Sequence, residues 1–166
     1  MNDIPIILPV GEGRTYECGP MRAVFKADGA ETCNRYSVSE WTVAPHGQGS
    51  GPHMHDQSDE LFFVTDGTMA VRVGDDWIDA ARGTFLRIPA GVIHDFENRT
   101  AVPAAVLNIF LPGGFEHLMP SIVDWFASQA SSVEVINNKA EQGGGPSAHP
   151  RHFSCGAGKR ATGERG

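Results

Sequence analysis

The sequence lacks the features that mark several common classes of protein. No segment approaches the roughly 20 apolar residues that a membrane-spanning helix needs, and the first ten residues show no basic stretch followed by an apolar run, as a secretory signal would. The sequence also contains no phosphate-binding glycine loop, no dinucleotide fingerprint and no Ser-His-Asp arrangement. We therefore expect a cytoplasmic protein without a membrane partner.

Cysteine and positive charge are both scarce. The three cysteines, Cys18, Cys33 and Cys155, fit neither a zinc ribbon nor a redox pair, so we expect free thiols. The net charge is −7, and residues 1–138 hold 8 basic against 18 acidic side chains, which argues against nucleic acid as a partner. Residues 139–166 are glycine-rich and lack periodicity, and we predict that they form a disordered tail.

Glycine and proline, by contrast, are abundant and divide the chain into short segments. Runs of about five apolar or alternating residues recur, with turn signals about every 8–12 residues. The predicted strands are 14–18, 21–27, 36–44, 61–65, 69–73, 77–80, 84–88, 92–97 and 104–111. This pattern predicts an all-β fold class, an antiparallel sandwich or barrel, in a chain of single-domain length.

Two segments outside these strands differ from them. Residues 4–10 are apolar but contain Pro5 and Pro9, which suits an edge strand or an arm laid across a neighbouring subunit. Beyond the last predicted strand, apolar residues recur at helical spacing. Here, over about residues 115–130, we expect a short turn and then a helix of roughly ten residues, with Pro120 in its first turn, packing on the barrel.

Residues 47–67 carry side chains typical of a metal site. His53 and His55 are two positions apart, so on an extended backbone they point to the same face. Glu60 follows five residues later, at the start of an apolar segment. Two imidazoles and a carboxylate suit a borderline divalent metal ion. The fourth ligand that we expect is His94, on a segment that follows a Pro-Ala-Gly turn.

The spacing of these residues resembles the two signature motifs of the cupin superfamily. They read Gly47-x5-His53-x-His55-x4-Glu60-x6-Gly67 and Gly83-x5-Pro89-x-Gly91-x2-His94-x3-Asn98, with every signature position filled. The resemblance covers about residues 20–112, within a single domain over residues 1–138. It implies a double-stranded β-helix, or jelly roll, with one divalent metal held inside the barrel by His53, His55, Glu60 and His94. Iron, manganese, nickel, cobalt, copper and zinc all suit such ligands.

A second resemblance concerns the function. The segment Leu111-Pro-Gly-Gly-Phe-Glu116 before the predicted helix, and residues 11–41, look like quercetin 2,3-dioxygenase-like cupins. This resemblance implies a homodimeric, metal-dependent dioxygenase that acts on a small aromatic or enol-type substrate with O2. Glu60 would then be both a metal ligand and the catalytic base toward a substrate hydroxyl. A decarboxylase, an isomerase and a non-catalytic small-ligand-binding cupin stay open as alternatives.

The expected substrate-binding residues are the apolar side chains near the ligands and one arginine: Phe62, Val64, Phe85, Arg87, Phe96 and Phe110. Phe62 and Val64 share strand parity with Glu60, and Phe96 shares parity with His94. Arg87 shares parity with Phe85, and an inward Arg87 would bind an anionic or carbonyl group, whereas an outward one would be solvated. The apolar residues also fit a simple barrel core.

Overall fold

The computed structural model describes residues 4–129 of the 166-residue chain. In chain order the elements are β1 (Arg14–Cys18), β2 (Met21–Ala27), α1 (Gly29–Thr32), β3 (Ser37–Val43), β4 (Asp59–Asp66), β5 (Thr68–Val73), β6 (Asp76–Ala81), β7 (Phe85–Ile88), β8 (His94–Glu97), β9 (Ala104–Leu111) and η1 (Phe115–Leu118), followed by a helix over 119–129. Each predicted strand is present, close to its predicted bounds. The predicted tail and Cys155 lie outside the described residues, whereas Cys18 and Cys33 are free thiols, as expected.

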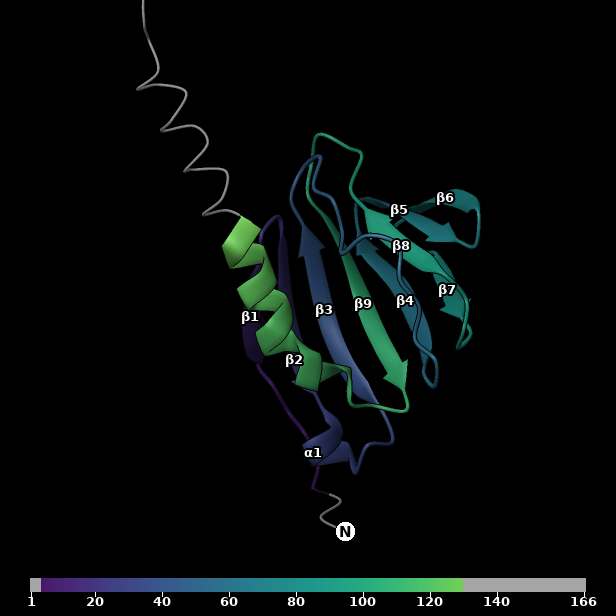
Figure 1. Cartoon of the computed structure of the whole chain (residues 1–166). Helices are drawn as coiled ribbons and strands as arrows, with labels where there is room; N and C mark the ends of the chain where they lie inside the picture. The colour runs from purple at the N-terminus through teal and green to yellow at the C-terminus, as the bar shows by residue number, and fades with distance from the viewer. Residues whose placement is uncertain (1–3, 130–166) are drawn as a thin grey trace, which may run out of the picture.

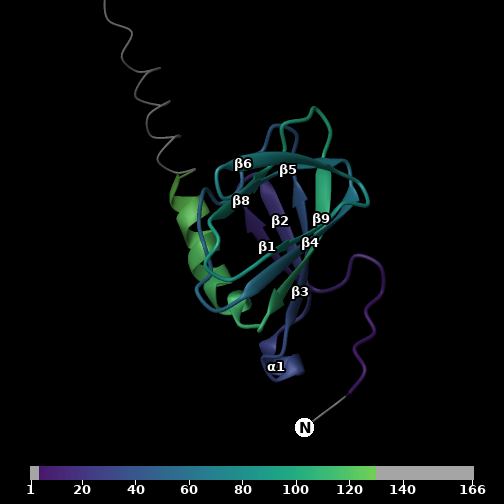
Figure 2. The same ribbon diagram turned by 90° about the vertical axis from the view of Figure 1, so that its right-hand side faces the viewer.

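The strands form two antiparallel sheets. The larger sheet has six strands in the order β1-β2-β3-β9-β4-β7, and the smaller has three in the order β6-β5-β8. Figure 2 shows β5, β6 and β8 closing over the larger sheet. Strands distant in sequence are neighbours in the larger sheet, where β9 lies between β3 and β4. This arrangement is the jelly roll that the sequence predicted.

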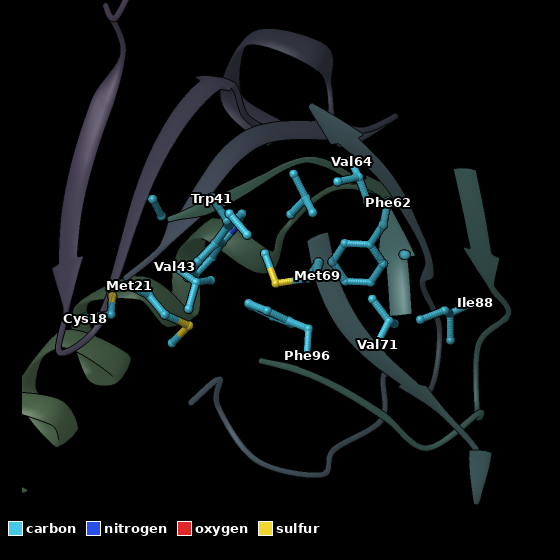
Figure 3. Close-up of a cluster of buried hydrophobic side chains, with 14 of the residues drawn as sticks. Cys18, Met21, Trp41, Val43, Phe62, Val64, Met69, Val71, Ile88 and Phe96 are labelled. Atoms are coloured by element: carbon cyan, nitrogen blue, oxygen red, sulfur yellow. The ribbon is translucent and has the colours of Figure 1, made fainter. Parts of the chain in front are cut away.

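Alternating side chains build the core between the two sheets. In β3, Trp41 and Val43 are buried, while the residues between and before them are half-buried or small. Phe62 of β4 and Phe96 of β8 complete the central cluster, which Figure 3 shows. The ring of Phe96 lies 6.0 Å from that of Trp41 and 5.8 Å from that of Phe62, between centroids. Each such buried side chain contributes about 1.5–3 kcal/mol through removal of apolar surface from water.

The segment after β9 folds as predicted, into a short turn and then a helix. Pro120 stands in the first turn of this helix, which Figure 1 shows in green beside β1 and β2. Met119 is fully buried, and Ile122 and Phe126 pack against the barrel core. Neither this helix nor any other within residues 4–129 is long and apolar enough to cross a membrane.

The N-terminal segment differs from one of its two expectations. Residues 4–10 form no strand, and Ile7 and Val10 are almost fully exposed along the outside of the barrel (Figure 2). Pro5 and Pro9 explain this, because neither can donate a backbone hydrogen bond to a ladder. The edge-strand expectation is therefore wrong, and the arm laid across a second subunit stays a prediction.

Candidate metal centre

The two motif segments pair with each other. His53 and His94 form an antiparallel bridge in which each backbone N–H donates to the other's carbonyl, at N···O distances of 3.0 and 2.8 Å. The backbone N–H of Gly91 donates to the carbonyl of His55 at 2.9 Å. His53 and His55 are half-buried, whereas Pro52 and Met54 are exposed. The backbone is therefore extended here, and both imidazoles face the barrel interior.

The loop before His53 is fixed by close backbone packing. A Cβ at Gly49 would lie 1.9 Å from the carbonyl oxygen of Phe96, so this position admits no side chain. Asn98, the last residue of the second motif, is 1% exposed and donates from Nδ2 to the carbonyls of Val43, Ala44 and Val102. Gly49 and the motif asparagine thus hold the loop that presents the histidines.

The four predicted ligands come together at one point. Ligand atoms of His53, His55, Glu60 and His94 all lie within 4.8 Å of one another. Nδ1 of His53 donates to the carbonyl of Gly51 at 2.8 Å, and Nδ1 of His94 donates to that of Val92 at 2.9 Å. Because Nδ1 carries the proton in each ring, Nε2 keeps the lone pair that a metal needs.

The interior of this cluster fits a cation. His55 Nε2, His94 Nε2 and Glu60 Oε2 are buried, and within residues 4–129 none of them has a hydrogen-bond partner outside the cluster. Nevertheless they approach closely, with His94 Nε2 at 2.5 Å and His55 Nε2 at 3.3 Å from Glu60 Oε2. Atoms that all carry lone pairs repel at such distances unless a proton or a metal ion lies between them. Three imidazoles and one carboxylate are a suitable set for a divalent transition metal.

Glu60 is held in the ionised form that metal binding requires. Burial raises the pKa of this carboxyl, but hydrogen bonds from His55 and His94, together with the charge of His94 and a bond from Asn108, lower it to about 2. Asn108 Nδ2 donates to Glu60 Oε1 at 2.5 Å, which leaves Oε2 for the cluster. Sequence reasoning missed Asn108, although one amide in the apolar strand β9 was a usable signal.

The histidines respond to burial and to Glu60 in different directions. Burial lowers the pKa of His53, so this imidazole stays neutral more readily. Burial also lowers the pKa of His94, but the hydrogen bond and the charge of Glu60 outweigh it, so the net pKa is raised. In the absence of metal, His94 is therefore the group that holds a proton against Glu60.

A small apolar cavity adjoins the cluster. Its volume is about 30 Å³, enough for one or two waters, and its walls include His53, Glu60, Trp41, Phe96, Phe110 and Phe115. Phe96 and Phe110 thus line the cavity, as the sequence predicted. Phe62 and Val64 are buried in the core but are not among the residues that line it. Sequence reasoning missed Trp41 and Phe115, because neither lies within the two motifs.

Two predicted substrate-binding residues lie on the wrong side of the sheet. Phe85 is 60% exposed, and Arg87 points outward, where its guanidinium pairs with Asp59 at 2.7 Å. The register explains this result: Glu60 pairs with Ile88, and cross-strand partners share a face. Phe85 and Arg87 have the opposite parity to Ile88, so both face away from the metal centre.

The comparisons with known proteins agree with this fold. Residues 39–110 match the family model described as Cupin domain. A Streptomyces coelicolor protein described as uncharacterized, SCO3923, is 38% identical over 61 residues, which are 37% of this chain. Those residues are 54% of that protein, so the match spans about half the length of this curated relative.

Solved structures extend the likeness over more of the barrel. TT1209 of Thermus thermophilus has a TM-score of 0.56 at 24% identity, over 65% of this chain and 98% of its own. A Thermotoga maritima protein described as a predicted oxalate decarboxylase has a TM-score of 0.60 at 12% identity, over 64% of this chain and 98% of its own. The polyketide cyclase RemF of Streptomyces resistomycificus has a TM-score of 0.57 at 19% identity, over 65% of this chain and 80% of its own. At these identities the likeness shows the fold alone.

Proposed function

We propose that this protein is a metal-dependent dioxygenase that acts on a small, uncharged aromatic or enol-type substrate. The observation that carries the proposal is a cluster of three imidazoles and one ionised carboxylate, in which Glu60 and His94 are buried and His53 and His55 half-buried, and which adjoins an apolar cavity. A divalent transition metal held by these four residues would supply Lewis-acid and redox chemistry at the cavity wall.

Glu60 is the residue proposed to handle the substrate proton. Asn108 fixes its Oε1, while its Oε2 lies inside the cluster, within reach of a group bound in the cavity. An enol or phenol hydroxyl brought to this oxygen would lose its proton to Glu60 as the hydroxyl oxygen approaches the metal centre. The low pKa of Glu60 in the metal-free chain keeps it ionised but also makes it a weak base, so this proton transfer would depend on a bound metal ion that makes the hydroxyl more acidic.

The cavity walls support an uncharged ring as the substrate. Trp41, Phe96, Phe110 and Phe115 offer aromatic faces and edges, against which a flat ring packs well. Among the described residues that line the cavity there is no lysine or arginine to bind a carboxylate or phosphate. Arg87, the cation that the sequence placed as a possible anchor, faces solvent. These features favour oxidation of an aromatic or enol over decarboxylation or isomerisation of an anionic substrate.

The first step of the test is the metal itself. The protein is stripped with a chelator, reloaded separately with iron(II), manganese, nickel, cobalt, copper or zinc, and its metal content is measured. We expect one equivalent per chain for at least one redox-active metal. A chain that binds none of these ions stoichiometrically would rule out the centre and the reaction together.

The second step is oxygen consumption by each loaded form with a flavonol, a catechol and a β-diketone. Stoichiometric oxygen uptake with one of them supports the proposal, and Glu60→Gln should abolish the uptake. Absence of uptake with every member of the panel at full metal occupancy contradicts it. Anaerobic turnover would instead favour a decarboxylase or isomerase, and a bound ligand that survives purification unchanged would favour a binding protein.

A further inference from the structure

The side chain of Phe115 separates two spaces that both reach the metal centre. The inner one is the cavity of about 30 Å³ that touches His53 and Glu60. The outer one is a groove of about 480 Å³, open to solvent, which touches His55. Phe110 and Phe115 line both spaces. Phe115 therefore forms part of the wall between the outer groove and the metal centre.

The sizes of the two spaces show that this wall has to open before an aromatic substrate in the groove can enter the inner cavity. The inner cavity holds one or two waters and no ring. The outer groove falls within the range of about 300–1,000 Å³ that is usual for small-molecule pockets. A ring of six or more carbons can approach His55 from the groove, and along this route it reaches Glu60 when the Phe115 ring moves aside.

Phe115 occupies a position built for a flat ring. Its ring stacks on that of Phe110, with centroids 4.3 Å apart and planes 8° from parallel. It meets the imidazole of His55 edge-on, with centroids 5.6 Å apart and planes at 84°. Trp41 adds a tilted contact at 6.5 Å. A slot between one parallel aromatic face and a predicted metal ligand selects planar groups.

The backbone that carries Phe115 is anchored independently of the ring. Glu116 is 8% exposed, and its carboxylate accepts from the backbone N–H of Gly29 at 2.8 Å and from that of Gly114 at 3.0 Å. Met119 is fully buried at the start of the following helix. Gly114 adopts φ +116°, and the space beside it, where a Cβ would stand, is empty. Because Phe115 also lines the open groove of about 480 Å³, its side chain has space to turn toward the groove while η1 keeps its anchors.

We propose that the slot now filled by the Phe115 ring is a binding site for a flat, uncharged aromatic group, which enters from the outer groove and replaces Phe115 on the face of Phe110. This inference rests on the proposed function and names the substrate class more narrowly. A hydroxyl on the edge of the bound ring then lies toward His55 and Glu60. The groove favours an uncharged ligand over an anion. Among the described residues that line it, Asp56 carries a negative charge and there is no lysine or arginine.

The test uses zinc-loaded full-length protein, with 2-naphthol as the probe and calorimetry as the measurement. Zinc has no redox chemistry, so binding is measured without turnover. In the wild type the probe has to displace Phe115 from its stack on Phe110. Phe115→Ala removes that competitor, and we expect 2-naphthol to bind roughly 3- to 10-fold more tightly, the ratio that corresponds to one aromatic pair.

Two controls separate this slot from general loosening of the cap. His117→Ala shortens another side chain of η1, which is 76% exposed and lines neither of the two spaces, and it leaves the stacked pair intact. We expect its affinity for 2-naphthol to equal that of the wild type. The second control is decahydro-2-naphthol, which has the same carbon skeleton and hydroxyl without planarity, and it should gain little from Phe115→Ala. Phe115→Leu keeps apolar bulk but cannot stack, and like Phe115→Ala it should tighten 2-naphthol binding. It replaces Phe115→Ala in the test if the alanine variant does not fold.

Unchanged or weaker 2-naphthol binding in both Phe115 variants would overturn the proposal. So would an equal gain in His117→Ala, or an equal gain for decahydro-2-naphthol. The outcome is independent of oxygen uptake. Tighter 2-naphthol binding in the Phe115 variants of a protein that consumes no oxygen with any metal would contradict the dioxygenase function and support the aromatic binding site. Oxygen uptake without any effect of the Phe115 variants on 2-naphthol binding would support the dioxygenase function and contradict the binding site.

Discussion

The inner and outer faces of strands β4 and β7 are chemically similar but have different roles. On the inner face, Glu60 and Phe62 are 3% and 1% exposed. On the outer face, Phe63 and Phe85 are 44% and 60% exposed and stand directly opposite each other. Each face thus offers phenylalanine close to a charged residue. The pairing of Glu60 with Ile88, rather than residue type, therefore decides which side chains can serve the metal centre.

The largest expected effect comes from truncating one phenylalanine on each face. Phe62→Ala should lower the free energy of unfolding by about 3–5 kcal/mol, because it leaves a cavity in the core. Phe85→Ala should change it by less than about 0.5 kcal/mol, the usual range for an exposed position. Urea unfolding of both variants at the same protein concentration provides the measurement. Equal losses would mean that the outer face is also buried, for example in a subunit contact.

The metal end of the inner face should respond next most strongly. His94→Ala removes a predicted ligand that is 2% exposed. We expect the metal affinity to fall by more than about 100-fold, because the loss of a ligand should exceed the loss of about 10- to 100-fold that follows when a residue supporting a ligand is changed. His117→Ala is the matched control, because its side chain is 76% exposed and lies outside the cluster. Competition with a chromophoric chelator measures both affinities. Wild-type affinity in His94→Ala would show that the fourth ligand is wrong.

Asn108 tests whether the support of Glu60 matters as well as the ligand itself. Asn108→Ala removes the hydrogen bond to Glu60 Oε1 without touching a ligand, so we expect a loss of metal affinity of about 10- to 100-fold. Ser37→Ala provides the comparison, since it removes a buried hydroxyl of the neighbouring strand β3 that has no hydrogen-bond partner within the described chain. A loss of equal size in both variants would indicate general loosening of the barrel.

The sequence was sufficient for the parts of the molecule that depend on local pattern and spacing. Turn residues and alternation located the strands, and the motif spacing located the four ligands. The sequence did not show which face of the sheet the side chains of β7 occupy. Only the register between β4 and β7 shows that Phe85 and Arg87 face outward. Asn108 and Phe115 were also missed. The amide in an apolar strand marks Asn108 as unusual, but its contact with Glu60, like that of Phe115 with Phe110, is set by the fold and not by local sequence.

The pH dependence of the metal-free protein tests the role of Glu60 on the inner face. Its folded pKa of about 2 lies below the ordinary 4.5, so its contribution to stability is present above pH 4.5 and is lost as pH falls toward 2. The raised pKa of His94 has the opposite sense: its contribution is complete below pH 6.5 and is lost as pH rises through the raised value.

We therefore expect the difference in Tm between the wild type and Glu60→Gln to be largest between pH 4.5 and 6.5 and to shrink on either side. Taking the difference between the two proteins largely removes the effect of His53, whose lowered pKa acts in the opposite direction to that of His94. Thermal unfolding of both proteins in the presence of a chelator, over a range of pH, measures this difference in Tm. A difference that does not vary with pH would show that Glu60 and His94 do not share a proton.

The smallest effect is expected on the outer face, at Arg87. Its guanidinium pairs with Asp59 across the exposed side of β4 and β7, and Asp59 also accepts from the backbone N–H of Ala90. Because solvent screens exposed pairs, Arg87→Ala should leave Tm and metal affinity close to those of the wild type. It should also leave 2-naphthol binding unchanged. If Arg87 bound the substrate directly, its removal would weaken 2-naphthol binding strongly. Loss of probe binding in Arg87→Ala would return Arg87 to the site and contradict the observed register of β7.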